Sequence, residues 1–146
     1  MIEIILKKTK EKAVLQRHPW VFSGALANVK GKPENGEIVK VLDQERNFLA
    51  YGYYNNLSRV AVRLLEWEEE VIIDDNWWIS RLKNAVEARK NILNEETNTC
   101  RLVFSESDYL PGLIVDIYND YLAVQILTAG IERVKGLLIS ALCELI

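Results

Sequence analysis

The amino-acid sequence predicts an α+β fold with two small domains, a barrel-like β domain followed by a mixed domain of strands and helices. Two observations lead to this prediction. Up to about residue 70, short strand candidates alternate with turn signals every eight to twelve residues, which is typical of small β barrels. After about residue 70, the apolar residues recur mainly at the three- and four-residue spacing of helices.

The first predicted domain begins with a strand over residues 2–6 and a short helix over residues 11–16. The helix must end there because Pro19 has no N–H and keeps the residue before it out of the helical region. We expect the link 44–47 to close a hairpin with Asn47 in the left-handed conformation. Three further strands are expected at 37–43, 48–54 and 60–65.

The second predicted domain begins with a helix that Asp74 or Asp75 can N-cap and that continues to about Leu93. A strand over 101–105, a structured turn over 106–112 and a hairpin of two strands follow. The last element is a helix with an apolar stripe that begins at Ile131. Because the chain stops inside this stripe without a helix stop signal, we expect the natural protein to continue.

The hairpin has a register that can be predicted from its pattern of apolar residues. Its strands cover 113–118 and 121–127, and Asn119 and Asp120 form the turn between them. If Tyr118 pairs with Tyr121, three apolar pairs share one face, and a slip of one residue would move them to the other face. These pairs are Leu113 with Ile126, Val115 with Val124, and Ile117 with Leu122.

The composition is that of a globular protein, because 49% of the 146 residues are hydrophobic and 27% are charged. No apolar run approaches the roughly 18–20 residues that span a bilayer, and the first residues lack the pattern of a signal peptide. We therefore expect a cytoplasmic protein with no membrane partner. Since the single His and the two Cys, Cys100 and Cys143, have no metal-ligand spacing, we expect no metal site and interpret both thiols as inert packing groups.

Charge is unevenly distributed along the chain. Residues 1–65 contain 11 Lys and Arg against 6 Asp and Glu, a net charge of +5, whereas residues 66–146 contain 7 against 15, a net charge of −8. A basic first half suits a polyanion partner such as RNA, and ordinary scatter of charge is the alternative. We place the change of domain at the acidic segment 66–70.

The segment Arg17–Gly24 combines a guanidinium, the only imidazole of the chain, an indole and a hydroxyl beside a glycine. Arginine suits phosphate groups and the aromatic rings suit stacking on bases, so the segment is a candidate RNA contact. The alternative is a helix-to-strand corner in which Trp20 and Phe22 belong to the core and Arg17 is solvated. Candidate phosphate contacts beside this segment are Lys7, Lys8, Lys10 and Lys12.

Three segments together resemble a known family. Arg17–Gly24, Tyr53–Arg63 and Ser105–Tyr118 are similar to motifs in the N-terminal part of S-adenosylmethionine-dependent methyltransferases of the large-subunit ribosomal RNA methyltransferase I type, which methylate cytosine C5. The resemblance covers essentially the whole chain, and the third segment is the most specific. It implies a PUA RNA-binding domain over 1–72, followed over 73–146 by a small α+β domain of strands around a helix. It also implies that the catalytic Rossmann-like domain lies outside this chain.

The resemblance implies roles for individual residues and partners. It places Arg17, His18, Trp20, Ser23 and Gly24 in the first RNA-binding motif of the PUA domain, and Ser58 and Arg63 in the second. The implied partners are ribosomal RNA and the C-terminal methyltransferase domain of the same protein. Candidates for docking that domain or the RNA are Arg89, Asp108 and Asp116, with a solvated structural role as the alternative.

The catalytic machinery itself is not expected in this chain. The seven glycines include no G-x-G pair, the pattern with which a strand–turn–helix unit approaches a nucleotide cofactor closely. We therefore expect no catalytic or cofactor-binding residue here, with S-adenosylmethionine serving the full-length protein. Two other functions remain open, a stand-alone non-catalytic RNA-binding module and a protein–protein adaptor that uses the acidic second domain.

Overall fold

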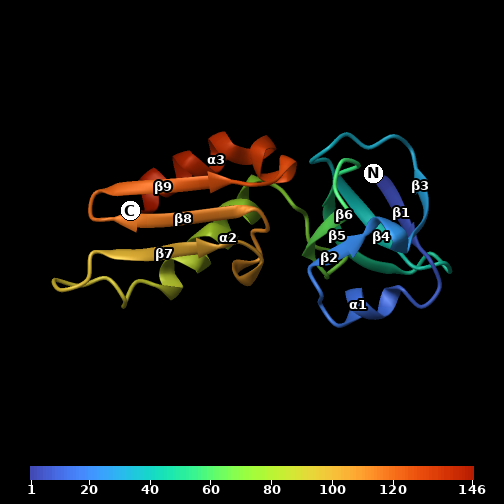
Figure 1. Cartoon of the computed structure of the whole chain (residues 1–146), viewed down its shortest axis with the longest axis horizontal. Helices are drawn as coiled ribbons and strands as arrows, with labels where there is room; N and C mark the ends of the chain where they lie inside the picture. Colours follow the sequence, from blue (N-terminus) through green and yellow to red (C-terminus); the bar gives the residue numbers. More distant parts are fainter. The chain divides into compact units, whose positions relative to one another are not determined.

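The computed structural model describes residues 1–146, which form two units, unit 1 from Met1 to Val71 and unit 2 from Ile72 to Ile146 (Figure 1). Each unit combines a β-sheet with helical segments, so the predicted α+β class is confirmed. None of the helices has both the length and the apolar character needed to cross a bilayer.

Unit 1 is a curled six-stranded sheet with the strand order β2-β6-β5-β4-β1-β3 (Figure 1). Neighbouring strands are antiparallel except for β1 and β4, which are parallel. A short helix, α1 (Glu11–Leu15), follows the first strand, and a 3-10 turn, η1 (Ser23–Ala25), follows the second. The strands are β1 (Ile2–Leu6), β2 (Trp20–Phe22), β3 (Leu26–Lys30), β4 (Ile38–Leu42), β5 (Phe48–Tyr54) and β6 (Val60–Glu66).

The curl of this sheet encloses one hydrophobic core, to which β1, β2, β4, β5 and β6 contribute buried residues and β3 contributes partly buried ones. Ile4, Val39 and Val62 are fully buried in it, and Val14 of α1 covers one end. Strands β5 and β6 approach closely at Gly52, where a Cβ would lie 2.5 Å from the carbonyl oxygen of Arg63. A larger residue would therefore separate the two strands at this point.

The predicted strands of unit 1 are confirmed at 2–6 and 48–54, and within one residue at 37–43 and 60–65. The strands β2 and β3 are additional to the prediction. Both are edge strands of the sheet, and most of their side chains are exposed or half-buried. The three residues of β2 are all apolar, and the burial of β3 does not alternate, so neither segment has a polarity period of two that would reveal a strand.

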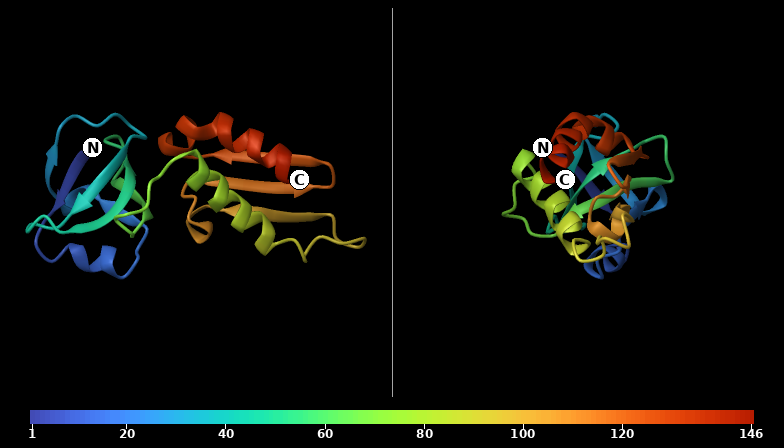
Figure 2. Two further views of the ribbon diagram at one scale, coloured as in Figure 1. Left: turned by 180° about the vertical axis from the view of Figure 1, so that it is seen from behind. Right: turned by 90° about the vertical axis from the view of Figure 1, so that its left-hand side faces the viewer.

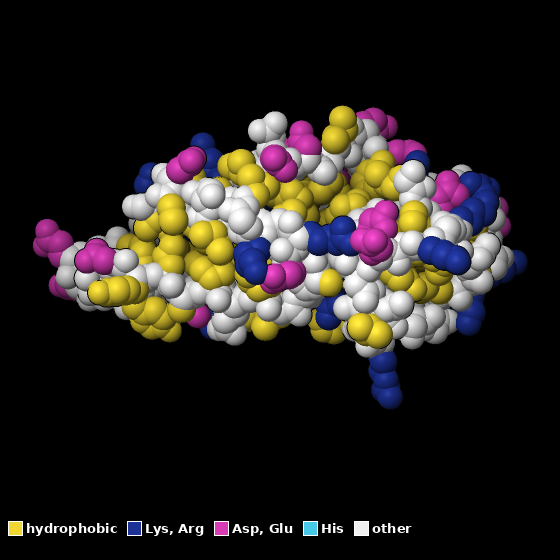
Figure 3. Space-filling view, turned by 90° about the horizontal axis from the view of Figure 1, so that it is seen from above, with side chains coloured by type: hydrophobic (Ala, Val, Ile, Leu, Met, Phe, Trp, Pro, Cys, Tyr) yellow, Lys and Arg dark blue, Asp and Glu magenta, His cyan; other side chains and the backbone are white.

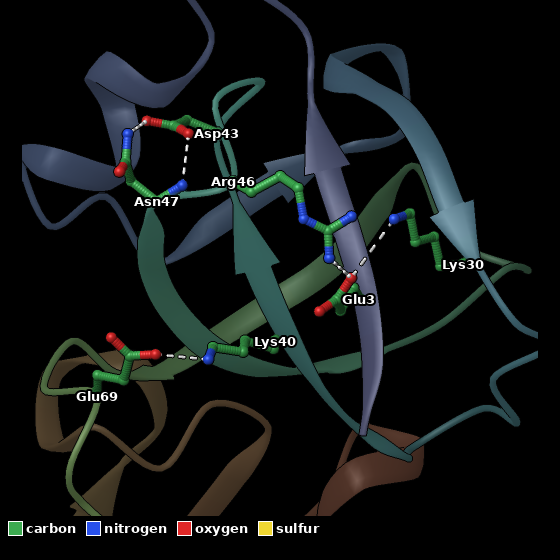
Figure 4. A network of polar contacts seen from close by, with 7 residues as sticks. All are labelled: Glu3, Lys30, Lys40, Asp43, Arg46, Asn47 and Glu69. Atoms are coloured by element: carbon green, nitrogen blue, oxygen red, sulfur yellow. Dashed lines mark hydrogen bonds and ion pairs between the residues drawn. The ribbon is translucent and has the colours of Figure 1, made fainter.

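The prediction that Asn47 adopts the left-handed conformation is wrong. The residue with positive φ in the β4–β5 link is Arg46, at 69°. Asn47 instead donates two hydrogen bonds of 2.8 Å to the Asp43 carboxylate, one from its backbone N–H and one from its side-chain amide (Figure 4). These bonds, the side-chain one first, lower the pKa of Asp43 below its ordinary value.

Unit 2 is a three-stranded antiparallel sheet with the order β7-β8-β9, covered on one face by two helices (Figures 1 and 2). The helices are α2 (Asp75–Ala88) and α3 (Ala129–Leu145), and the strands are β7 (Thr99–Phe104), β8 (Leu113–Tyr118) and β9 (Tyr121–Ile126). A 3-10 turn, η2 (Ser105–Asp108), links the first two strands. The side chains of Asp74 and Thr128 cap the two helices by accepting backbone N–H groups.

The β8–β9 register agrees with the prediction at every pair, including Val115 with Val124 and Tyr118 with Tyr121. Val115 is fully buried under the helices, whereas Gln125 lies on the opposite, exposed face. Helix α2 starts as expected but ends five residues before the predicted Leu93. The Arg89 guanidinium caps its end by donating to the carbonyl oxygen of Ala85 at 3.0 Å.

Candidate nucleic-acid interface

Four lysines gather where β1 leads into α1. The chain turns at Thr9, which has a φ of 73°, and Lys7 and Lys8 precede this turn while Lys10 and Lys12 follow it. All four side chains are exposed, and none takes part in an ion pair with an acidic side chain. Lys7 donates a hydrogen bond of 2.9 Å to the carbonyl oxygen of Gly24, which ties this turn to η1. We call these four residues the lysine turn.

Three other cations of unit 1 have acidic partners within it. Lys30 and Arg46 lie 3.9 and 2.6 Å from the same Glu3 carboxylate, and Lys40 lies 2.5 Å from Glu69 (Figure 4). The hydrogen bond to Glu69 raises the pKa of Lys40. In Figure 3, some Lys and Arg side chains over unit 1 lie beside Asp and Glu side chains, and others at its edge do not. The densest group of cations without an acidic partner is therefore the lysine turn, and the other such cations of unit 1 are Lys32, Arg59 and Arg63.

The acidic segment 66–70 packs against unit 1 and lies directly before the end of this unit at Val71. The indole N–H of Trp67 donates to the carbonyl oxygen of Val14 at 2.9 Å, and the Tyr51 hydroxyl donates to that of Glu69 at 2.8 Å. With this segment included, residues 1–71 contain 11 Lys and Arg against 10 Asp and Glu, a net charge of +1. The basic character is thus local and does not extend over the whole unit.

Arg17 adopts a positive φ of 61° directly after α1 and is held by two contacts. Its guanidinium lies 3.7 Å from the Glu68 carboxylate and 5.4 Å from the centroid of the Trp67 ring. Both members of the Arg17–Glu68 pair are more than half exposed, so the pair is worth little and a phosphate group can compete with Glu68.

Three aromatic rings form a cluster along β2 and the residue pair before it. His18, Trp20 and Phe22 alternate along the chain, with ring centroids 6.1 to 6.5 Å apart. The His18 Nδ1 accepts a hydrogen bond of 3.1 Å from the Trp20 backbone N–H, which orients the imidazole. Trp20 is 36% exposed and Phe22 49%, whereas Val21 between them is buried. The alternative that Trp20 and Phe22 belong to the core is therefore wrong.

The remaining candidates of unit 1 lie on both sides of β2. Arg63 of β6 pairs with Trp20 in the sheet register, and Ser23 donates its backbone N–H to the carbonyl oxygen of Arg59 at 2.8 Å. Gly24 is exposed and linked to Lys7. Ser58 lies in the β5–β6 turn, where its hydroxyl accepts the backbone N–H of Val60 at 3.1 Å. The fold thus brings the lysine turn, Gly24, Trp20 and Arg63 together, while Ser58 stabilises a turn.

The sequence analysis did not include Phe22 among the candidate RNA contacts, and it did not predict the groove beside this residue. This groove, of about 370 Å³, lies between α1 and the β2–η1 segment, and its lining includes Lys10, Ala13, Trp20 and Phe22. The alternation of aromatic residues at positions 18, 20 and 22 is a signal that could have revealed the cluster, because alternate residues of a strand share one face.

In unit 2, Arg89, Asp108 and Asp116 have internal partners. The Arg89 guanidinium forms a bidentate ion pair with the Asp108 carboxylate, with N–O distances of 2.6 and 2.9 Å. Asp108 also accepts a hydrogen bond of 2.6 Å from the backbone N–H of Phe104. Arg101 binds Asp116 in the same manner, at 2.8 and 3.1 Å, and the pKa of Arg101 is raised by this bond. Both aspartates are largely buried, so the solvated alternative is wrong for them. A docking role for these residues stays a prediction.

The two cysteines differ from one another. Cys100 is half-buried in β7, and burial raises the pKa of its thiol, in agreement with a packing role. Cys143 is exposed on α3, so the prediction that it is a packing group is wrong. The sequence could not decide this, because the residue lies at the margin of the apolar stripe of the helix.

Comparison with known proteins identifies the relatives of this chain. Residues 4–67 match the sequence family described as PUA-like domain. The chain is 41% identical over 143 residues to ribosomal RNA large subunit methyltransferase I of Tolumonas auensis, and 37% identical over 142 residues to that of Escherichia coli. Each alignment covers 97% of this chain and 36% of the relative, so the chain spans about a third of the length of these proteins.

Solved structures share the fold over nearly the whole chain. A protein from Streptococcus mutans, assigned as an S-adenosylmethionine-dependent methyltransferase, superposes with a TM-score of 0.85 at 17% identity, over 99% of this chain and 38% of its own. The structure of SMU.776 in complex with SAH gives a TM-score of 0.86 over 99% of this chain and 37% of its own. The chain therefore has a PUA-like first unit, and its resemblance to the N-terminal part of the ribosomal RNA large subunit methyltransferase I family is confirmed.

Proposed function

We propose that this chain is the RNA-recognition and spacer part of an S-adenosylmethionine-dependent ribosomal RNA methyltransferase that modifies cytosine C5. The observation that carries the proposal is the lysine turn, a set of exposed lysines without acidic partners, which lies beside the β2 aromatic cluster in a PUA-like unit. Exposed cations of this kind bind RNA phosphates and release counterions, which gives most of the affinity of such interfaces.

The residues divide into two kinds of contact. Lys7, Lys8, Lys10, Lys12 and Arg17 contact phosphates, since their side chains are exposed and either have no acidic partner or a weak one. The other proposed contacts are His18, Trp20, Ser23, Gly24, Ser58 and Arg63, which surround β2 or support the turns next to it. Phosphate contacts fix the position of an RNA, and contacts to its bases supply specificity.

S-adenosylmethionine belongs to the full-length protein in this proposal. The relatives are named as methyltransferases and are nearly three times as long as this chain. We propose that the cofactor site and the catalytic residues lie in the part of such a protein that this chain does not cover. Unit 2 then acts as a spacer between the RNA-binding unit and that part. The ion pair of Arg89 with Asp108 ties the end of α2 to η2, and that of Arg101 with Asp116 joins β7 to β8.

A protein–protein adaptor is the second candidate, and one observation favours it. The face of the unit 2 sheet that the helices do not cover exposes Phe104, Tyr118 and Tyr121. Exposed aromatic residues are enriched in protein interfaces. Binding of a protein partner that does not depend on salt would favour this function over RNA recognition.

Titration of the chain with a fragment of large-subunit ribosomal RNA at several salt concentrations tests the proposal. The logarithm of the affinity should fall linearly with the logarithm of the salt concentration, and Lys10→Ala should reduce the slope by about one. Lys40→Ala is the matched control, since Lys40 is already paired with Glu69 and its loss should leave the slope unchanged. An affinity that is independent of salt, or absent, would contradict the proposal.

A further inference from the structure

Strand β9 forms one edge of the unit 2 sheet, and the backbone groups on its outer side have no partner. In a strand, the backbone groups of alternate residues point to the same side. The N–H of Leu127 donates toward β8, to the carbonyl oxygen of Gly112 at 2.8 Å. The N–H and C=O groups of Leu122, Val124 and Ile126 therefore point away from β8, and no other part of the chain bonds to them.

The other edge strands of the protein carry features that hinder pairing with a further strand. Strand β2 has only three residues and an irregular register with β6. Strand β3 ends on Lys30 and has an irregular register with β1, and β7 contains Arg101 beside a register shift. Charged residues, bulges and short length are the usual protection of a sheet edge.

Strand β9 has none of these features. Its six residues, from Tyr121 to Ile126, include no charged residue and no proline. Its register with β8 continues without a shift from the turn to the end of the strand. An open, regular and uncharged edge of this kind is a template for pairing with another strand.

The edge of β9 is complementary to a second copy of itself. In an antiparallel pairing centred on Val124, this residue faces Val124 of the second copy, and Leu122 faces Ile126. All the outward backbone groups of both strands are then used, because each of these pairs exchanges two hydrogen bonds. On the open face of the sheet, Ala123 faces Gln125 by the same symmetry. A contact of this kind is isologous, since both copies use the same surface.

The same pairing covers two exposed apolar side chains. It places Tyr121, which is 77% exposed, opposite Leu127 of the second copy, which is 61% exposed. Figure 3 views the chain from the side of β9 and α3 and shows hydrophobic side chains gathered over unit 2. Because β9 has no charge with which to select a charged partner, its own copy, which offers an apolar side chain to each of these residues, matches it better.

We propose that β9 pairs with β9 of a second copy of this chain, so that the two unit 2 sheets join into one continuous sheet in a symmetric dimer. The inference does not depend on the proposed RNA-binding function, because the pairing surface lies in unit 2 and the lysine turn lies in unit 1.

Sedimentation of the full 146-residue chain over a wide range of concentration tests the inference with two double variants. The first, Ala123→Lys with Gln125→Lys, places like charges directly opposite one another across the twofold axis. The second, Ala123→Lys with Gln125→Glu, places opposite charges there. Both positions are exposed, and the variants share the change at position 123, so any effect on Asp116, which faces it from β8, is common to both. Thermal melting reports whether the fold is retained.

We expect the unmodified chain to reach twice the mass of one chain, 16.8 kDa, as the concentration rises. The dissociation constant of the dimer should be about tenfold higher in the variant with like charges than in the variant with opposite charges, because each charged pair occurs twice in the symmetric contact.

Two outcomes would overturn the inference. If the unmodified chain stays a monomer at every concentration, β9 does not pair with a second copy. If a dimer forms and the two variants weaken it equally, the copies meet at another surface. Neither result affects the proposed function, which is measured by the binding of RNA and its dependence on salt.

Discussion

The lysine turn of unit 1 and two arginines of unit 2 use their charges in opposite ways. In unit 1, the lysine turn is exposed and has no acidic partner, whereas in unit 2 the cations Arg89 and Arg101 are each fixed by two contacts to an aspartate. A cation with an internal partner stabilises its own unit, and a cation without one is available to another molecule. The net charges of the two halves of the sequence therefore describe the protein less well than the pairing of single side chains.

The largest expected effect is a loss of folding stability in unit 2, which tests the register of β8 and β9. Val115→Asp should destabilise the protein by about 4 kcal/mol or more, because it buries an unpaired carboxylate beneath the helices. Gln125→Asp on the exposed face of the same sheet should change stability by less than about 0.5 kcal/mol. Urea unfolding of both variants measures the two values. Equal losses would show that the β8–β9 register, or the exposure of the Gln125 face, is incorrect.

A somewhat smaller effect tests whether the unit 2 ion pairs are structural. Asp108→Ala should cost about 3 kcal/mol, because it leaves the largely buried Arg89 guanidinium and the Phe104 N–H without their acceptor. Asp120→Ala in the exposed β8–β9 turn is the control and should be nearly neutral. Chemical unfolding gives both values. If Asp108→Ala is neutral as well, Asp108 serves a partner outside the chain and not its own unit.

The smallest expected effect is a change in the pKa of Asp43, which tests its hydrogen bond with Asn47 in the β4–β5 link of unit 1. Asn47→Ala removes the side-chain hydrogen bond that is the main cause of the lowered pKa of Asp43, so this pKa should rise toward its ordinary value. Because the folded-state pKa is lowered, the contribution of Asp43 to stability is present above the ordinary aspartate pKa and is lost as the pH falls through the folded-state value. NMR titration of the Asp43 carboxyl carbon measures the shift, and an unchanged pKa would assign it to the backbone donors alone.

The sequence predicts unit 2 more closely than the interface in unit 1. The β8–β9 hairpin is predictable to the residue because both strands alternate in polarity and the turn has two residues, so only one register buries the apolar face. Trp20, Val21 and Phe22 are all apolar, so no polarity pattern tells which of them faces the core. The exposure of Trp20 and Phe22 could not be deduced for that reason.

The ion pairs could not be predicted from the sequence, for another reason. Arg89 and Asp108 are 19 residues apart, and Lys40 and Glu69 are 29 residues apart, so only the folded arrangement brings them together. Local spacing rules cover partners three or four residues apart on a helix, or facing residues of a predicted hairpin. The sequence therefore could not tell which cations of unit 1 have no acidic partner. The lysines of the lysine turn could still be chosen as candidates without this knowledge.

Two triple variants that remove the same charge test the central claim that unpaired lysines bind the RNA. One replaces Lys8, Lys10 and Lys12 with Ala, and the other replaces the paired Lys30, Lys40 and Arg46. The measurement is the slope of log affinity against log salt concentration for a ribosomal RNA fragment. We predict that the first variant loses about two to three units of slope and that the second keeps the slope of the unmodified protein. Equal losses in both variants would contradict the account, because net charge alone would then explain the binding.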